Sequence, residues 1–375
     1  MPELCPISAC SGCAACANRC PKDAICMAPD ANGFLRPAID ATRCIDCGLC
    51  RKACPVLTPP VFSPRADTPF AAWAKDAAIR SASSSGGLFS VFANQVVKNG
   101  GAANGVRFDA DFTLRHRIVE SVDEIAKVRG SKYVQASVGD IYREVERILK
   151  SGRRFLFTST PCQVAGLLAY LGKPYDNLVT CDFVCHGVPS PRAFKDYLRC
   201  VMAQRGIDSA VDYGFRTCDG WGFAPHIITQ SGVCVKLRPQ TDAYFQDFMA
   251  GRGYRESCYQ CLYARSKRVS DLTIGDFWGV PLSFQAQRHT EKGCSLLLVN
   301  TDKGKKFVEK CADELVCCPR SWHECRDNHQ LFEPSVPRGR WACSWLYRAL
   351  RFGFYRLPRR IVWIIVKKIY VGELR

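Results

Sequence analysis

The sequence predicts a small cysteine-rich domain followed by a larger domain of the α+β or α/β class with a mixed sheet. Three observations support this prediction. Ten of the 24 cysteines lie in the first 54 residues, and a stretch with four prolines follows shortly afterwards. Beyond that stretch, apolar segments of strand length alternate with segments of helical periodicity. The 375 residues allow such a division, because a domain takes roughly 150 residues.

The N-terminal cysteines form an internal repeat. The run Cys10-x-x-Cys13-x-x-Cys16-x-x-x-Cys20-Pro21 recurs as Cys44-x-x-Cys47-x-x-Cys50-x-x-x-Cys54-Pro55. This spacing is typical of bacterial ferredoxins with two [4Fe–4S] clusters, in which the fourth cysteine of each run ligates the cluster of the other run. The predicted ligands are therefore Cys10, Cys13, Cys16 and Cys54 for one cluster, and Cys44, Cys47, Cys50 and Cys20 for the other.

Two Cys₄ zinc sites are the alternative, since zinc also binds C-x₂-C pairs. Each run, however, supplies three closely spaced cysteines, a fourth cysteine and a proline, which favours iron–sulfur clusters. Cys5 and Cys26 fall outside the repeat, and we interpret them as small buried side chains. The first residues show no secretory signal, so we expect a cytoplasmic protein whose cysteines bind metal rather than form disulfides.

We predict four segments along the chain. These are a dicluster domain over residues 1–58, a proline-rich linker over 59–70, the large domain over 71–335 and a basic tail over 336–375. Asn32-Gly33 predicts a hairpin in the small domain. In the large domain, periodicity predicts helices over 86–98, 141–149, 161–171 and 191–203, strands over 154–158, 178–184, 272–277 and 295–300, and a hairpin over 226–237. Thr160 is placed to cap the third helix, with Pro161 in its first turn.

Neither a GxGxxG fingerprint nor a P-loop occurs in the sequence, so a standard Rossmann domain loses its main support. Six other motifs follow one another in the large domain. They are Ser83-Ser-Ser-Gly-Gly-Leu88, Gly130-Ser-Lys-Tyr-Val-Gln135, Thr160-Pro-Cys-Gln-Val-Ala-Gly166, Cys185-His-Gly-Val-Pro-Ser-Pro191, Ser257-Cys-Tyr-Gln-Cys261 and Ser270-Asp-Leu-Thr-Ile-Gly-Asp-Phe-Trp-Gly279. Together, over about residues 70–310, they resemble the coenzyme F420 hydrogenase/dehydrogenase β-subunit family. The resemblance implies an iron–sulfur flavoprotein, with FAD on a non-Rossmann α/β domain beside a [4Fe–4S] cluster and a ferredoxin-like domain in front of it.

The resemblance implies that the flavin contacts lie on the first two motifs. The serine–glycine run precedes a predicted helix, whose positive end and N–H groups suit a phosphate, although such a run is more often only a helix cap. The second motif offers a glycine, a hydroxyl, a charge and an aromatic ring, which without the resemblance would be interpreted as a loop. The predicted contacts are Ser84, Ser85, Gly86, Gly87, Gly130, Ser131, Lys132, Tyr133 and Gln135.

Four cysteines of the large domain are candidates for a third [4Fe–4S] cluster. Cys258 and Cys261 form a C-x₂-C pair, and Cys162 lies in the first turn of a predicted helix, whose dipole stabilises a thiolate. The inclusion of Cys162 and Cys185 depends on the resemblance, and Cys181 is an alternative to Cys185. The alternative for the whole set, Cys162, Cys185, Cys258 and Cys261, is a group of reduced structural cysteines.

Other polar residues are candidates for lining the site. Asp276 and Trp278 follow a predicted strand, where α/β sites tend to lie, and His186 follows another. A packed tryptophan and a structural histidine are the simpler interpretations. The basic residues that would suit an anionic carrier are Arg216, Lys236 and Arg265, unless they are merely solvated. The catalytic residues are unknown, because the flavin itself would perform the chemistry.

The net charge of +17 is concentrated at one end, since residues 338–375 carry ten Lys or Arg and one Glu. This distribution is not a general nucleic-acid footprint, and we expect no nucleic-acid partner. Cations interleaved with Trp, Leu and Ile predict an amphipathic tail at the inner face of a membrane, or else a helix packed on the body or a partner. The longest strongly apolar run, residues 361–366, is far shorter than the roughly 20 residues that span a bilayer.

These features predict an oxidoreductase that moves electrons between [4Fe–4S] clusters, FAD and a reduced carrier, coenzyme F420 or ferredoxin, or an organic substrate. The alternative is a noncatalytic electron-transfer subunit that docks to another oxidoreductase. Bound flavin and oxidation of a carrier by the isolated chain would favour the first hypothesis. A third hypothesis, a zinc-stapled interaction module, is disfavoured by the cysteine spacing.

Overall fold

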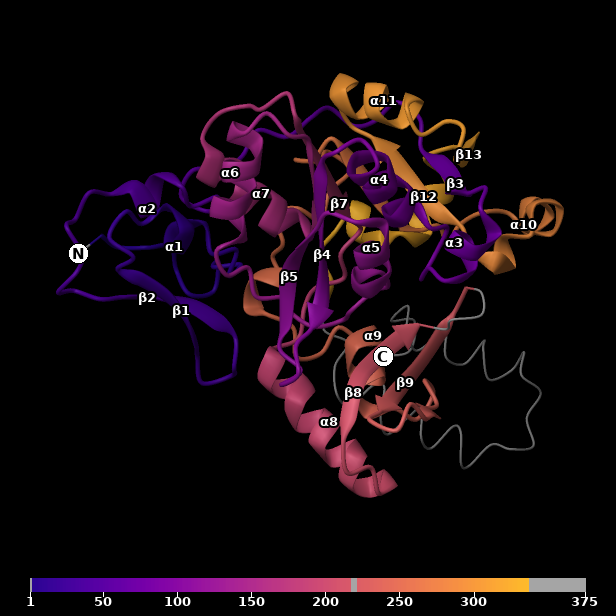
Figure 1. Ribbon diagram of the computed structural model, residues 1–375, viewed down its shortest axis with the longest axis horizontal. Helices are drawn as coiled ribbons and strands as arrows, with labels where there is room; N and C mark the ends of the chain where they lie inside the picture. Colours follow the sequence, from indigo (N-terminus) through magenta and orange to yellow (C-terminus); the bar gives the residue numbers. More distant parts are fainter. Residues whose placement is uncertain (1, 217–220, 337–375) are drawn as a thin grey trace, which may run out of the picture.

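The computed structural model describes residues 2–216 and 221–336. A small N-terminal domain, indigo in Figure 1, lies beside a large domain with a mixed sheet. The prediction of a small cysteine-rich domain followed by a mixed-sheet domain is therefore confirmed. The predicted tail begins at residue 336, so the expected membrane contact falls outside the described residues.

The N-terminal domain contains two short helices and one hairpin. The elements are α1 (Ala15–Arg19), β1 (Ile25–Pro29), β2 (Leu35–Ile39) and α2 (Leu49–Lys52). Strands β1 and β2 pair antiparallel, which confirms the predicted hairpin. Its turn is fixed by Asp30, whose Oδ1 accepts hydrogen bonds from the backbone N–H groups of Asn32 and Phe34.

The large domain is built on an eight-stranded sheet with the order β13-β3-β12-β11-β7-β6-β4-β5. The four neighbouring strands β11, β7, β6 and β4 are parallel, and the remaining strands are antiparallel to their neighbours. The carboxyl ends of the four parallel strands therefore meet at one edge of the sheet. The bounds are β3 (Phe70–Ala74), β4 (Ala102–Phe108), β5 (Leu114–Val119), β6 (Phe155–Ser159), β7 (Leu178–Phe183), β11 (Leu272–Asp276), β12 (Ser295–Val299) and β13 (Leu315–Pro319).

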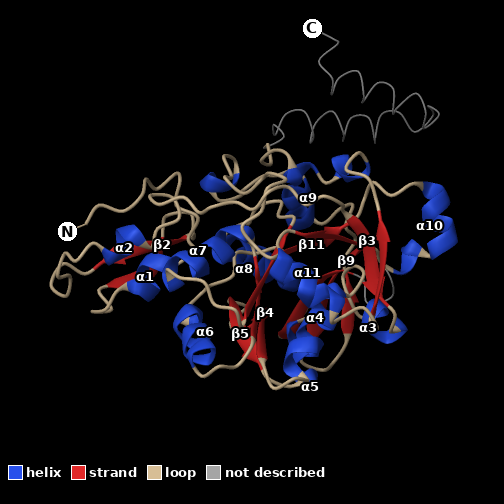
Figure 2. Cartoon of the chain, turned by 90° about the horizontal axis from the view of Figure 1, so that it is seen from above, coloured by secondary structure: helices blue, strands red, loops and turns tan. Residues whose placement is uncertain are grey.

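Helices cover both faces of this sheet. Figure 2 shows α4 (Leu88–Val97), α5 (Val122–Val128) and α11 (Asp302–Glu309) grouped together, with α6 (Ile141–Lys150) and α7 (Pro161–Leu171) on the side of the N-terminal domain. Side chains on β6 alternate between the two layers, as strand geometry requires. Phe155 and Phe157 pack with α6 and α7, whereas Leu156 packs with α4.

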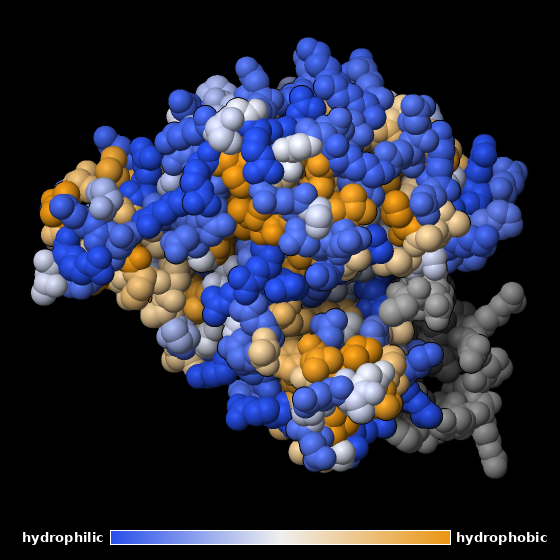
Figure 3. Space-filling view, viewed as in Figure 1, coloured by the Kyte–Doolittle hydropathy of each residue, from blue (hydrophilic) through white to orange (hydrophobic). Residues whose placement is uncertain are grey.

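A second, three-stranded sheet forms a separate lobe. It contains β8 (Ala210–Arg216), β9 (Phe223–Thr229) and β10 (Cys234–Lys236), and it packs against α8 (Pro191–Arg205) and α9 (Ala243–Met249). Its core is mainly aromatic, with Phe194, Tyr213, Phe215 and Tyr244 in mutual ring contact. In Figure 3 apolar residues gather over this lobe on a mostly hydrophilic face. The remaining helices of the described part include α3 (Ala77–Ser81) and α10 (Leu282–Arg288).

The predicted helices are confirmed as α4, α6, α7 and α8, and the predicted strands as β6, β7, β11 and β12. The predicted hairpin at residues 226–237 is β9 and β10. Thr160 occupies the N-cap position of α7, but its Oγ1 lies 3.4 Å from the Sγ of Cys162 and makes no capping bond. Among the described helices, none is long and apolar enough to cross a bilayer.

A buried ion pair joins the parallel strands to the loop that carries Cys261. Arg268 and Asp182 are almost completely buried, and the Nη2 of Arg268 lies 2.9 Å from Oδ1 of Asp182. Asp182 is the second-last residue of β7, and its Oδ1 also accepts from Thr273 on β11 at 2.7 Å. Arg268 donates further to the carbonyls of Tyr263 and Phe183. The guanidinium is therefore paired and fully bonded, whereas Oδ2 of Asp182 has no hydrogen-bond partner in the protein.

Replacing Arg268 with Met should lower the free energy of unfolding by about 3–5 kcal/mol, because the Asp182 carboxylate would remain buried without its partner. Urea unfolding under anaerobic conditions, followed by tryptophan fluorescence, measures this loss. Arg199→Met is the matched control, since its ion pair with Asp196 is exposed and should contribute almost nothing. Equal losses in the two variants would contradict the structural role of the buried pair.

Candidate functional site

A cavity with a volume of about 910 Å³ lies at the carboxyl ends of the parallel strands. Its walls include Thr160 after β6, Cys185 after β7 and Asp276 at the end of β11. Ser11 of the N-terminal domain and Phe248 of the second lobe also line it. Ligands of open α/β sheets bind in this position, and cavities with volumes up to roughly 1,000 Å³ suit cofactors.

Seven of the nine predicted flavin contacts line this cavity: Ser84, Ser85, Gly130, Ser131, Lys132, Tyr133 and Gln135. Gly86 and Gly87 are not among its lining residues. A Cβ on Gly86 would lie 2.4 Å from the carbonyl oxygen of Ala72, and Gly87 begins α4 with a φ of 88°. These two glycines therefore shape the loop that presents the serines.

The two predicted flavin motifs lie side by side. The Oγ of Ser84 accepts a 2.7 Å hydrogen bond from the backbone N–H of Ser131. The neighbouring hydroxyls bond within the protein, since Ser83 donates to the carbonyl of Ile79 and Ser85 to that of Cys294. A ligand phosphate would therefore meet the Ser84–Ser131 junction rather than three free hydroxyls.

Lys132 is half-buried, and desolvation lowers its pKa to about 8. Its Nζ donates to the carbonyls of Val128 and Arg129 at 3.1 and 2.6 Å. Val128 is the last residue of α5, so the ammonium satisfies the carboxyl end of that helix. Lys132 thus fixes the loop in addition to lining the cavity.

Tyr133 lines the cavity and is bonded by Arg216, which does not line it. The Tyr133 ring stacks on Phe248 with a centroid distance of 4.3 Å, and its hydroxyl accepts from Nη1 of Arg216 at 3.1 Å. Arg216 pairs with Asp276 at 2.7 Å and is itself buried. Of the three predicted carrier-binding cations, Arg216 therefore serves an internal ion pair. Lys236 and Arg265 do not line the cavity.

The cavity has the features of a site for a large planar cofactor. Leu88, Phe89, Val106 and Trp278 supply apolar surface. Thr158 and Asn328 also belong to the lining residues, but Oγ1 of Thr158 and Oδ1 of Asn328 have neither a hydrogen-bond partner nor exposed surface, so these two atoms do not face the cavity.

The four cysteines predicted for a third cluster come together beside the cavity. Cys162, Cys185, Cys258 and Cys261 all line it. Burial raises the pKa of Cys162 to about 11 and that of Cys185 well above its usual value, and the neighbouring thiols of Cys258 and Cys261 add to the effect on Cys185. The alternative residue Cys181 packs instead into the core on the α4 face. Such a set of half-buried thiols suits a cationic iron–sulfur core that stabilises their thiolate forms.

The N-terminal cysteines lie in two neighbouring groups. Burial and the thiols of Cys10 and Cys54 raise the pKa of Cys16 to about 12, which places Cys16 beside both. Burial raises the pKa of Cys50, and Cys47 and Cys20 are its nearest thiol neighbours in the other group. Cys5, which the sequence analysis placed outside the repeat, lies beside Cys10 and Cys54, and these thiols raise its pKa. All cysteines in the described part of the chain are free thiols.

Within residues 2–216 and 221–336, no group of three or more Cys, His, Asp or Glu side chains is arranged to hold a single metal ion.

The third cysteine set lies next to the N-terminal domain. Helix α1 packs against α7, whose first turn carries Cys162. A Cβ on Gly166 of α7 would lie 2.9 Å from Cβ and 3.1 Å from Sγ of Cys13. The rings of Tyr142 and Tyr263 occupy the same cluster of buried residues. Glycine at this position therefore allows the close approach of Cys13 to α7.

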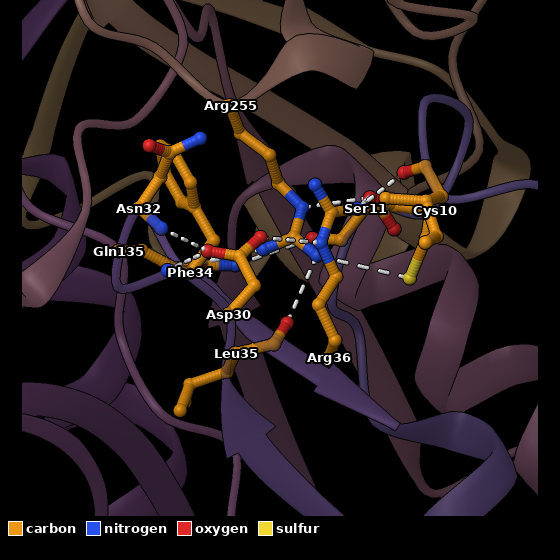
Figure 4. Close-up of polar contacts among 10 residues, drawn as sticks. Cys10, Ser11, Asp30, Asn32, Phe34, Leu35, Arg36, Gln135 and Arg255 are labelled. Atoms are coloured by element: carbon orange, nitrogen blue, oxygen red, sulfur yellow. Dashed lines mark hydrogen bonds and ion pairs between the residues drawn. The ribbon is translucent and has the colours of Figure 1, made fainter. Parts of the chain in front are cut away.

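Arg255 is a site residue that the sequence analysis missed. Its side chain is fully buried, and Figure 4 shows it between Cys10, Leu35 and Gln135. A single arginine in a polar segment gives no signal of burial. The one available signal is its position three residues before Cys258.

Gly166→Ala should lower the free energy of unfolding by about 1–3 kcal/mol, because the added methyl group would overpack the contact with Cys13 and Tyr142. Alanine inside an exposed helix would instead raise stability by up to about 1 kcal/mol. The sign of the change in the free energy of unfolding, measured by anaerobic urea unfolding, thus shows whether Gly166 is in close contact with Cys13. A stabilised variant would show that α7 does not approach the cysteine loop as described.

Comparisons with known proteins agree with this arrangement. Residues 69–141 and 152–320 match the family models for the N-terminal and C-terminal parts of the coenzyme F420 hydrogenase/dehydrogenase β subunit. Residues 9–57 match the model of a 4Fe–4S dicluster domain. No match was found among curated proteins.

Solved structures also share the fold. One chain of the xenon-derivatized F420-reducing [NiFe] hydrogenase complex from Methanosarcina barkeri superposes with a TM-score of 0.51 at 15% identity. The match covers 72% of the present chain and 90% of that chain. The chain described here thus belongs to the coenzyme F420 hydrogenase/dehydrogenase β-subunit family and carries a 4Fe–4S dicluster domain in its N-terminal part.

Proposed function

We propose that the chain is an iron–sulfur flavoprotein oxidoreductase. It would move electrons between [4Fe–4S] clusters, FAD and a reduced carrier, coenzyme F420 or ferredoxin, or an organic substrate. The observation that carries this proposal is the position of Cys162, Cys185, Cys258 and Cys261 in the wall of the one large cavity described above. A cofactor in that cavity would lie directly beside a cluster held by these residues.

Each predicted contact has a role in this scheme. The Ser84–Ser131 junction would bind a phosphate, and the Gly130 loop would allow close approach of the cofactor backbone. Bound FAD would supply the conversion of a two-electron hydride into single electrons. The apolar side chains of the cavity wall, among them Phe89 and Trp278, would keep water away from the site.

The cysteine sets would form a path out of the cavity. Cys162 lies beside both the cavity and Cys13, so electrons would pass from the third cluster to the one on Cys10, Cys13, Cys16 and Cys54. From there they would reach the cluster on Cys20, Cys44, Cys47 and Cys50. Cys47 is exposed, which suits exchange with an external partner.

A noncatalytic electron-transfer subunit is the second candidate. The M. barkeri chain with the same fold belongs to a hydrogenase complex, which supports docking of the present chain to a partner oxidoreductase. Exposed Ile7 and Ile45 on the N-terminal domain provide apolar surface near the predicted clusters. In either case we place the protein in the cytoplasm, with its basic tail at the inner face of the membrane.

The chain purified without oxygen should contain about 12 iron atoms and about one FAD, as three [4Fe–4S] clusters and one flavin require. Cys258→Ser should reduce the iron to about 8 atoms, whereas Cys200→Ser, on an exposed face of α8, should leave it unchanged. Analysis of iron, acid-labile sulfide and flavin measures both. Full iron without flavin would favour the second candidate, and zinc in place of iron would refute both.

Ser84→Ala should weaken FAD binding about 5- to 10-fold, since one hydrogen bond of about 1 kcal/mol to the cofactor would be lost. Ser84 lines the cavity, and its Oγ lies at the junction with Ser131. Flavin fluorescence titration measures the affinity. Thr241→Val, at an exposed site, serves as the control. Unchanged affinity in Ser84→Ala would place the flavin phosphate elsewhere.

A further inference from the structure

The guanidinium of Arg255 is buried where the N-terminal domain meets the cavity. Its side chain has no measurable exposure. Nε donates to the carbonyl of Cys10 at 2.7 Å, and Nη2 donates to that of Leu35 at 2.9 Å. Nη1 donates to Oε1 of Gln135 at 3.0 Å, and Gln135 in turn bonds the carbonyl of Ser11. The one guanidinium of Arg255 thus bonds to residues of both domains, as Figure 4 shows.

The same guanidinium touches a predicted cluster ligand. Nη2 lies 3.7 Å from Sγ of Cys10, within hydrogen-bond range for sulfur. The backbone of Arg255 is anchored to the third cysteine set, since its N–H donates to the carbonyl of Val188 and its carbonyl accepts from the N–H of Cys258. Arg255 therefore links a sulfur of the N-terminal group to the loop of the third set.

The side chains of Gln135 and Arg255 pack closely against Gly12. A Cβ on Gly12, whose φ is +68°, would lie 2.7 Å from Nε2 of Gln135 and 2.9 Å from Cζ of Arg255. The corresponding residue of the second run is Asp46, whose φ of 52° is also in the left-handed region. The two halves of the repeat thus share a backbone conformation here, but the Cys10 half has a glycine at the position where Arg255 packs.

We propose that Arg255 is a positioning residue that also raises the reduction potential of the cluster on Cys10, Cys13, Cys16 and Cys54. The inference rests on the proposed function, because it requires that cluster. When the cluster gains one electron, its net charge becomes more negative by one. A buried cation with a hydrogen bond to a ligand sulfur stabilises this reduced form.

The consequence is a preferred resting place for the electron. The Cys10 cluster adjoins the third set, and a higher potential there would hold electrons beside the cavity rather than at the outer cluster. Arg143 provides the comparison in the other half of the domain. It donates to the backbone carbonyls of Asn18 and Cys20 and pairs with Asp23, at a partly exposed position.

The test is a redox titration of the anaerobic holoprotein, monitored by electron paramagnetic resonance, on the wild type, Arg255→Gln, Arg255→Lys and Arg143→Gln. Cys16→Ser assigns the signal of the Cys10 cluster. Arg255→Gln should retain its iron and lower the equilibrium constant for reduction of this cluster about tenfold, which is about 59 mV for one electron. Arg255→Lys keeps the positive charge and should lower this equilibrium constant about threefold. Arg143→Gln should change the equilibrium constant less than twofold.

An unchanged midpoint in Arg255→Gln with full iron would overturn the inference and leave the proposed function intact. If that variant loses iron, Arg255→Lys decides: a lowered midpoint supports the role, and an unchanged one overturns it. A wild-type protein without iron–sulfur signals would instead refute the proposed function, so the two failures are distinct. Equal shifts of the midpoint in Arg143→Gln and Arg255→Gln would show that the loss of any positive charge has the same effect, and would contradict a specific role of Arg255.

Discussion

The close approach of the N-terminal cysteine loop to the carboxyl edge of the sheet is the constraint on which the site depends. Two glycines permit it, because Gly12 leaves room for Arg255 and Gly166 leaves room for Cys13. The contact buries thiols from both domains in one cluster with Tyr142 and Tyr263. A larger side chain at either glycine would separate the cysteine sets and break the predicted path between them.

Buried guanidinium groups follow from this arrangement, and each of them is hydrogen-bonded. Arg268 with Asp182 fixes the loop of Cys261, Arg216 with Asp276 fixes the cavity wall, and Arg255 fixes the domain contact. Each guanidinium also donates to backbone carbonyls, which offsets the cost of removing it from water. The loops around the cavity are therefore held by directional bonds from strands and from each other, which suits a site that must position cofactors.

Much of the fold could be predicted from the sequence where the pattern is local. The repeat placed the dicluster domain, and periodicity placed α6, α7 and β7 within a few residues. Strands β3 and β4 were not predicted, since Phe70–Ala74 and Ala102–Phe108 are rich in alanine and glycine and owe their state to sheet pairing. The residues gathered around the cavity were predicted only in part. The cysteines and Ser84 have motifs, whereas the burial of Arg255 and the unpaired Thr158 arise from tertiary packing that no local pattern encodes.

The central claim is that the third cysteine set holds a cluster adjacent to the cluster on Cys10, Cys13, Cys16 and Cys54. Electron paramagnetic resonance of the fully reduced anaerobic protein tests it most directly, because unpaired spins on adjacent clusters interact. The account predicts a spectrum broadened by interaction with the third cluster, and a simpler spectrum from only the two N-terminal clusters in Cys258→Ser. An identical spectrum from the wild type and from Cys258→Ser would contradict it.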